Sequence, residues 1–227
     1  WSSDVCSSDL LSSMSAIVTD TKNLVNQELV PYVVIAVVLC CIVLAVTMDS
    51  FVIPVLFMLS IGMAIIYNLG TNVFKGEISF ITMSLVAVLQ LGVTMDYSIF
   101  LWGSYKEQRE SIADKNEAMA HAIAATITSV TGSSLTTIAG FIALCFMSFT
   151  LGLDMGVVMA KGVLLGVICC VTVLPSLILV FDKAIWKTAH KTVHLPTDGL
   201  SEFVMKHYKL FAVIMVVLWI PALYGNA

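Results

Sequence analysis

Six apolar windows, each long enough to cross a lipid bilayer, constrain the fold of this chain more than any other feature of its sequence. A membrane-spanning helix needs about 20 predominantly apolar residues, each adding about 1.5 Å to its length. Hydrophobic residues make up 59% of the 227 residues and charged residues only 11%, more apolar surface than one soluble core would need. We therefore predict an all-α integral membrane protein. The windows lie near residues 32–48, 51–69, 81–103, 132–151, 157–180 and 209–225.

The first ten residues, WSSDVCSSDL, do not fit this pattern. They are rich in Ser and Asp, start without Met, and lack the basic start and the apolar centre of a signal peptide. Back-translated, they read like a common sequencing-library adapter. We interpret residues 1–10 as an artefact fused to a genuine sequence and leave them out of the fold prediction. The alternative is a real polar N-terminal tail.

Basic residues in the connections between the windows predict the orientation of the spans. The connection near 104–131 holds three of them and the segment near 181–209 holds five, together eight of the 11 Lys and Arg residues. Because basic loops stay on the cytoplasmic side, both segments are predicted to be cytoplasmic. The first span then enters from outside and the sixth ends outside. A tight turn at Asp49-Ser50 makes the first two spans an antiparallel hairpin.

Three polar segments flank or connect the spans. Residues 11–31 are polar and helix-compatible, and we expect them to be the end of an external domain. Asp114 stands three residues before Glu117, the spacing of a helix N-cap with its capping-box partner, so a cytoplasmic helix is predicted to lead into the fourth span. His121 is then a solvated residue of that helix. Residues 182–208 mix aromatic residues with lysines around a turn, LPTDG, which predicts a cytoplasmic interfacial linker between two membrane units.

An aspartate interrupts the third window, within GVTMDYSIFLW at residues 92–102. The helical rise places Asp96 roughly 20 Å below the outer surface, near or just beyond the bilayer midplane. A charged aspartate there costs roughly 2.5–3.5 kcal/mol, so such a residue normally faces a bundle interior or a wet cavity and takes part in ion or proton movement. Because burial raises the pKa of a carboxyl group and water or a cation lowers it, a carboxyl group that moves between the two environments loads and unloads a proton. The alternative is a satisfied polar residue that only holds helices together.

Several neighbours of Asp96 are candidates to support it. The hydroxyl of Tyr97 could share a hydrogen bond with a carboxylate. Gly92, four residues earlier on the same helix face, would let a neighbouring backbone come close. The fourth window opens with TGSSLTT, whose hydroxyls could bond to their own backbone, to water or to Asp96. From these hydroxyls we select Ser133, Ser134 and Thr137.

The fifth window carries the other charge predicted to lie inside a span. Lys161 is nearer the outer surface than Asp96 by more than ~10 Å of helical rise, so we expect it to snorkel to the outer headgroups or to pair with Asp154 rather than with Asp96. Two small-xxx-small pairs predict tight packing of this span. They are Gly152/Gly156 and Gly162/Gly166.

The run from LGVTMDYSIFLWGSYKEQRE through AMAHAIAATITSVTGSSLTTIAGFIALCF to LGLDMGVVMAKGVLLGVICCVTVLPSLILVFD resembles the MMPL (mycobacterial membrane protein large) branch of the resistance-nodulation-division (RND) transporters. The most specific part is Gly92 followed by Asp96 and then by Tyr97-Ser98-Ile99-Phe100. The resemblance covers nearly the whole chain after residue 10. The protein-export components SecD and SecF share the fold but have Asp-Ala-Asn-like residues at this point.

The resemblance implies an RND-type transmembrane helical bundle, about six spans of a transporter with two repeats. Members have one helix, a large external porter domain, five more helices, a cytoplasmic linker and a repeat of the same plan. It also implies that Asp96 and Tyr97 form a proton relay on the fourth helix of the family, with a second Asp-Tyr pair on the tenth, beyond this sequence. The sequence alone should therefore not transport. Residues 11–31 would end the first porter domain, 32–181 would be helices two to six, 182–208 the linker and 209–227 helix seven.

The resemblance implies a transporter driven by the proton motive force, exporting lipids or other hydrophobic or amphiphilic compounds across the bacterial plasma membrane. Protons would be the coupling ion, with no organic cofactor. The implied partners are the bilayer, the substrate and the second half of the same polypeptide, and a homo-oligomer is left open. The sequence shows no nucleophile–base pair, metal-ligand cluster or phosphate-binding loop, so it predicts neither an enzyme nor a metal site, and no nucleic acid partner.

Two alternatives are a sterol-sensing-like regulatory membrane domain without transport and a SecD/SecF-like accessory subunit for protein export. The pair Asp96-Tyr97 favours the transporter over the first, because a purely structural bundle does not need that carboxylate. The tyrosine after the aspartate favours it over the second.

Overall fold

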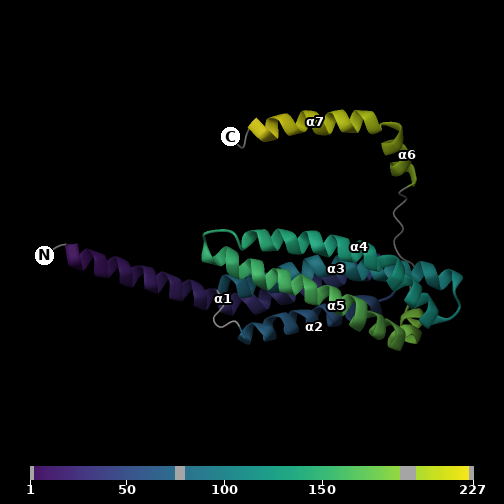
Figure 1. Cartoon of the computed structure of the whole chain (residues 1–227), viewed down its shortest axis with the longest axis horizontal. Helices are drawn as coiled ribbons and strands as arrows, with labels where there is room; N and C mark the ends of the chain where they lie inside the picture. The colour runs from purple at the N-terminus through teal and green to yellow at the C-terminus, as the bar shows by residue number, and fades with distance from the viewer. Residues whose placement is uncertain (1–2, 75–79, 190–197, 225–227) are drawn as a thin grey trace. The chain divides into compact units, whose positions relative to one another are not determined.

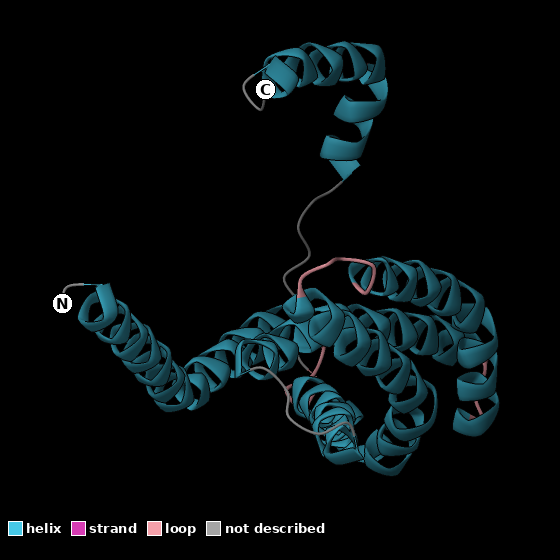
Figure 2. Cartoon of the chain, turned by 60° about the vertical axis from the view of Figure 1, so that its left-hand side comes forward, coloured by secondary structure: helices cyan, strands magenta, loops and turns pink. Residues whose placement is uncertain are grey.

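The computed structural model describes residues 3–74, 80–189 and 198–224, and nearly all of them are helical (Figure 1, Figure 2). They fall into two compact units, Trp1–Lys191 and Thr192–Ala227. The first unit holds α1 (Ser3–Thr47), α2 (Val52–Gly70), the short 3-10 helix η1 (Thr71–Phe74), α3 (Phe80–Ser111), α4 (Lys115–Leu144) and α5 (Thr150–Lys187). The second unit holds α6 (Asp198–Lys206) and α7 (Tyr208–Tyr224). The predicted all-α fold class is confirmed.

Five helices in the described ranges are long and apolar enough to cross a membrane, and they are α1 to α5. In α1 the apolar part is Gln27–Thr47. Each of these five helices holds most of one of the first five predicted windows. The sixth window falls on α7, whose 17 residues give a length of about 25 Å, at the lower end of what spans a bilayer.

The connection between α3 and α4 is much shorter than predicted. The apolar window ends at residue 103, but α3 continues to Ser111 and α4 begins at Lys115. The predicted N-cap is confirmed, because the Asp114 carboxylate accepts a hydrogen bond of 3.1 Å from the backbone N–H of Glu117. His121 is exposed on α4, as predicted. Hydropathy marks where a helix enters lipid, whereas the helix itself ends where its backbone groups are capped.

The predicted limits of the fourth and fifth spans are wrong by several residues. α4 ends at Leu144 rather than near 151, and α5 begins at Thr150 rather than near 157. The residues between them are apolar but form a turn, which hydropathy alone does not distinguish from helix. The predicted close packing of Gly152 and Gly156 is confirmed, because a Cβ at Gly156 would lie 2.6 Å from the Phe141 carbonyl oxygen and a Cβ at Gly152 would lie 3.1 Å from that of Leu144.

Two flanking segments differ from their predicted limits. α1 is one continuous helix that includes residues 11–31, predicted as the end of an external domain, and residues 3–10. α5 continues past residue 181 to Lys187, so the first residues of the predicted linker belong to it. The first three residues of LPTDG lie outside the described residues, and its last two, Asp198 and Gly199, are the first residues of α6. The interpretation of residues 1–10 as an artefact stays a prediction.

Helix α5 packs against α2, α3 and α4. Its glycines allow the close approach to α3, because a Cβ at Gly166 would lie 2.2 Å from Cγ2 of Thr94. Figure 2 shows the helices of this unit side by side in a second orientation. The largest buried side chains of the main apolar core come from α2, α3, α4 and α5. They include Phe57, Trp102, Tyr105, Met119, Leu174 and Ile178.

We expect Gly166→Ala to destabilise the bundle by about 1–3 kcal/mol, the usual cost of adding a methyl group to a well-packed interface. Thr94 cannot turn away freely, because it is β-branched and its hydroxyl donates to the Gln90 carbonyl at 2.6 Å. The matched control is Gly140→Ala on α4, where a Cβ would meet nothing within 4 Å. Thermal unfolding in detergent micelles should separate the two variants. Equal melting temperatures would show that α3 and α5 are not in the contact described.

One end of the bundle is the place where α1, α3 and α5 finish and where α2 and α4 begin; we call it the basic end. There Lys106 forms an ion pair of 2.8 Å with Asp49. The Ser50 and Thr188 hydroxyls are 2.7 Å apart, and Ser50 and Ala189 form an isolated β-bridge. This end carries the basic connection predicted to be cytoplasmic.

Candidate functional site

Asp96 lies at the middle of α3, which is 32 residues long. Its side chain is exposed, whereas that of the next residue, Tyr97, is only 3% exposed. Successive residues of a helix point about 100° apart, so the two side chains enter different surroundings. The Asp96 carboxylate has no hydrogen-bond or ion-pair partner among the residues that the structure describes.

The face of α3 that carries Asp96 is open along its length. Gly92 is exposed on this face, and a Cβ there would meet nothing within 4 Å. Phe100, one turn further, is 63% exposed. Gly103 and Glu107 continue the exposed face towards the basic end. The predicted alignment of Gly92 with Asp96 is therefore present, and no described helix of this unit covers it.

Tyr97, rather than Asp96, meets the hydroxyls of α4. Its hydroxyl is in polar contact with the side chains of Thr137 and Ser133. Of the three hydroxyls selected from the sequence, Ser134 is elsewhere: it is buried, and it donates to the Thr131 carbonyl at 2.9 Å. The structure thus brings two of the predicted supporting residues to Tyr97 and none of the three to Asp96.

The face of α3 turned towards α5 carries a buried amide network that the sequence reading missed. The Asn68 side-chain amide donates to Oε1 of Gln90 at 2.8 Å and to the Val158 carbonyl at 3.2 Å. The Gln90 amide donates to the Gly162 carbonyl at 3.1 Å. We call Asn68, Gln90 and the α5 carbonyls of Val158 and Gly162 the amide clamp. Single amides inside apolar windows were the available signal, because each needs a partner in the membrane.

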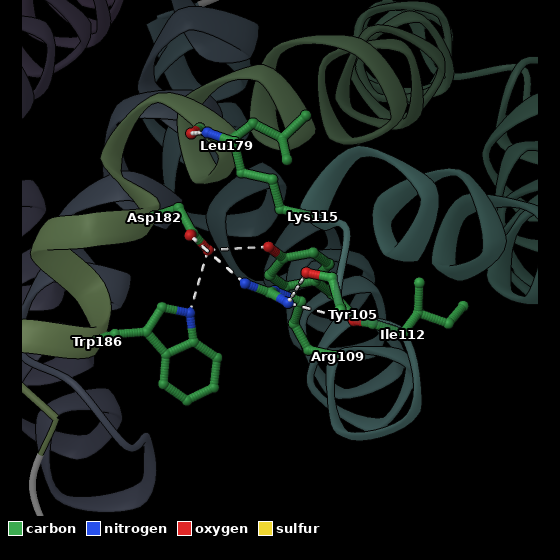
Figure 3. Close-up of polar contacts among 8 residues, drawn as sticks. Tyr105, Arg109, Ile112, Lys115, Leu179, Asp182 and Trp186 are labelled. Carbon is green, nitrogen blue, oxygen red and sulfur yellow. Dashed lines mark hydrogen bonds and ion pairs between the residues drawn. The ribbon is translucent and has the colours of Figure 1, made fainter.

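A second buried network joins α3 to α5 at the basic end (Figure 3). Oδ1 of Asp182 accepts from the Tyr105 hydroxyl at 2.9 Å and from the Trp186 indole N–H at 3.1 Å. Asp182 is only 7% exposed and Tyr105 is fully buried. We call Tyr105, Asp182 and Trp186 the carboxylate clamp. The sequence analysis placed Asp182 at the start of the predicted cytoplasmic linker, residues 182–208, so its burial was not predicted.

Two basic side chains complete this end of the bundle. Arg109 donates to the carbonyls of Ile112 and Ala113, at 3.2 and 2.7 Å, and so caps the end of α3. One of its nitrogens lies 4.0 Å from Oδ2 of Asp182, at the limit of an ion pair. Lys115 donates to the Leu179 carbonyl at 3.0 Å and ties the start of α4 to α5. All of these side chains are labelled or drawn in Figure 3.

Lys161 lies in the half of α5 away from the basic end. Its ammonium group donates to Oδ1 of Asn72 in η1, at the end opposite to the basic one. Snorkelling of Lys161 towards the outer headgroups agrees with this position. Asp154, the other partner predicted for Lys161, also takes part in an interaction.

Comparison with known proteins agrees with this architecture. Residues 10–217 match the MMPL family. The chain is 26% identical over 206 residues to the membrane protein YdfJ of Bacillus subtilis, which covers 84% of this chain and 28% of YdfJ. It is 30% identical over 167 residues to the membrane protein ActII-3 of Streptomyces coelicolor, covering 70% of this chain and 23% of that protein.

A further relative bears a functional name. The chain is 24% identical over 174 residues to the probable transport protein MmpL4 of Mycobacterium leprae, covering 74% of this chain and 18% of MmpL4. The chain therefore spans between 18% and 28% of the length of these three curated relatives. The match to the family covers most of the chain, so it belongs to the MMPL family of membrane proteins.

Proposed function

We propose that this chain is part of a proton-driven membrane transporter of the RND type, exporting lipids or other hydrophobic or amphiphilic compounds from the cell. Asp96 would carry the proton, and Tyr97, whose hydroxyl lies near the side chains of Ser133 and Thr137, would stand beside it. The name of MmpL4, a probable transport protein, supports transport as the activity. The cell membrane would be its location, as a multi-pass protein.

One observation carries the proposal: a carboxylate with no partner among the described residues lies at mid-helix on an open face of α3. Exposing a charged aspartate to lipid at that depth costs roughly 2.5–3.5 kcal/mol, so this face needs protein or water over it. The second half of the same polypeptide is the cover that we propose. The glycines of this face leave room for a helix backbone to approach the carboxylate.

In this proposal the Asp96 carboxylate takes a proton from water that enters from outside and becomes a neutral acid. A neutral acid is cheaper than a carboxylate to hold in an apolar contact, so the covering helix can close on α3. When water reaches the site from the cytoplasm, the acid releases its proton and the contact opens. Each cycle moves a proton inward without consuming any group of the protein.

The dependence on the proton gradient tests this function. In energised inverted vesicles that contain the full-length protein, a fluorescent amphiphile should be taken up into the vesicle interior, the direction equivalent to export. A protonophore added at steady state should abolish the accumulation. Accumulation that survives collapse of the gradient would refute proton coupling, and an ATP requirement would indicate a different class of transporter.

A second candidate is a lipid- or sterol-binding regulatory domain, and one feature favours it. An apolar groove of about 500 Å³ lies between α1 and α3, beside the helix turn that carries Asp96. The hydroxyl of Thr47, a residue of this groove, is satisfied within its own helix, because it donates to the Val43 carbonyl at 3.0 Å. If the protein binds sterol but the amphiphile does not accumulate, this second function is the better one. The groove is lined by Leu39, Cys40, Val43, Leu44, Thr47, Met48, Met95 and Ile99.

A further inference from the structure

The rotation of α3 about its own axis decides which way Asp96 points. Each residue turns the helix by about 100°, so Tyr105, nine positions after Asp96, points about 180° away from it. Gln90, six positions before Asp96, points about 120° away. Both side chains are fully buried against α5, whereas Asp96 is exposed. The polar contacts of α3 with α5 therefore lie on the far side of the helix from Asp96.

The amide clamp fixes α3 at a point before Asp96 along the helix. Gln90 uses both ends of its amide, because Oε1 accepts from Asn68 and Nε2 donates to the Gly162 carbonyl. The space is also closed to other side chains, because a Cβ at Gly162 would lie 2.5 Å from the Asn68 amide nitrogen. Rotation of α3 would break two directional hydrogen bonds of side chains that are fully buried, Asn68 and Gln90.

The carboxylate clamp fixes α3 at a second point, after Asp96 along the helix. The Tyr105 hydroxyl donates to a buried carboxylate that Trp186 also holds, and both Asp182 and Trp186 belong to α5. The Trp102 and Tyr105 rings pack at a centroid distance of 5.8 Å, and this contact further limits the orientation of the Tyr105 side chain. The ion pair with Arg109 is long, at 4.0 Å, so the two neutral donors carry most of this contact.

We propose that the amide clamp and the carboxylate clamp are positioning devices for the proton relay, with Gln90, Tyr105 and Asp182 as positioning residues. Together they hold α3 against α5 in one rotation, which keeps Asp96 turned to the open face and Tyr97 turned to α4. Apolar contacts between helices tolerate small rotations and slips, whereas buried polar contacts specify one register. This inference rests on the proposed function of Asp96.

The test uses the full-length protein in liposomes, with its native free cysteines replaced by alanine and a spin label at Phe100→Cys, one turn from Asp96 on the same face. We expect a single label environment in the parent protein. Tyr105→Phe, Gln90→Leu and the double variant should each give a second environment or a changed access of a lipid-soluble relaxing agent. Ser176→Ala is the control, because among the described residues the Ser176 hydroxyl donates only to the Thr172 carbonyl of its own helix, at 2.8 Å. An unchanged label environment in the double variant would overturn the inference.

Transport is measured on the same variants without the label. Misplacing a reacting group by about 1 Å can cost on the order of 100-fold, so we expect the double variant to lose coupled transport on the order of ten-fold or more and to show a shifted pH profile. Asp182→Asn keeps an acceptor oxygen for Tyr105 and Trp186, so it should retain the parent label environment and pH profile, unlike Asp182→Ala. Equal pH profiles in the parent and the double variant would contradict a positioning role.

The label experiment also separates this inference from the proposed function. If Asp96→Asn leaves transport unchanged, the proposed function fails, whatever the label shows. If Asp96→Asn abolishes transport while the clamp variants alter neither the label environment nor the pH profile, the clamps are not positioning devices and the relay still stands.

Discussion

Asp96→Asn is expected to lower gradient-driven transport of an amphiphile by about 100-fold or more, because a positioned proton-transfer group commonly contributes 10²–10⁴-fold. Asparagine keeps nearly the same shape and can fill the same space but cannot load or release a proton at neutral pH. The side chain makes no hydrogen bond or ion pair with any other described residue, so the change should leave the fold intact. Initial uptake rates in energised vesicles, at matched protein levels, give the measurement.

The matched control for this variant is Glu107→Gln. Glu107 is an exposed carboxylate of α3, eleven positions after Asp96 and so within about 20° of the same face. It lies at the basic end rather than at mid-helix, so its loss should leave transport within about two-fold of the parent, as expected for a solvated surface charge. If both variants lose transport alike, the effect comes from the charge of this face and not from a proton carried by Asp96.

Asp182→Ala is expected to lower the free energy of unfolding of the bundle by about 3 kcal/mol, because truncating one partner of a buried polar network leaves the others without theirs. The Tyr105 hydroxyl and the Trp186 indole N–H would both lose their acceptor. This is the largest stability change that we expect from a single side chain at the basic end. Unfolding by a denaturing detergent, followed by circular dichroism, gives the measurement.

Asp49→Ala is the control for Asp182→Ala. It also removes an aspartate at the basic end, but the Asp49–Lys106 pair is partly exposed, with side-chain exposures of 25% and 38%. Solvated pairs contribute about 0–1 kcal/mol, so this variant should unfold close to the parent. If Asp182→Ala lowers the free energy of unfolding no more than Asp49→Ala does, the carboxylate clamp adds nothing to stability.

The helices of the bundle could be predicted from hydropathy, but most of their ends could not. Apolar windows located α1 to α5 because the bilayer demands long apolar segments. The end of α4 at Leu144 was missed because the turn after it is as apolar as the helix. The start of α4 was predicted well because a specific interaction marks it, the bond from the Glu117 N–H to Asp114.

The residues of the candidate site could be selected from the sequence, but their geometry could not. Asp96 and Tyr97 are distinctive in an apolar window, so the sequence alone points to them. Their separation into an open face and a buried contact depends on which side of α3 meets α5, and neither hydropathy nor spacing fixed that rotation. Asp182 was missed because a carboxylate beside a lysine at the end of a span is the usual pattern of a solvated boundary.

The most direct test of Asp96 as the proton carrier is to measure proton movement driven by the substrate. The full-length protein is reconstituted in liposomes with a pH-sensitive dye inside, and a fluorescent amphiphile gradient is imposed without any pH gradient. We expect the parent protein to move protons against the direction of amphiphile flow and the Asp96→Asn variant to move none above empty liposomes. Equal proton movement in the parent and the variant would contradict the assignment of the relay to Asp96.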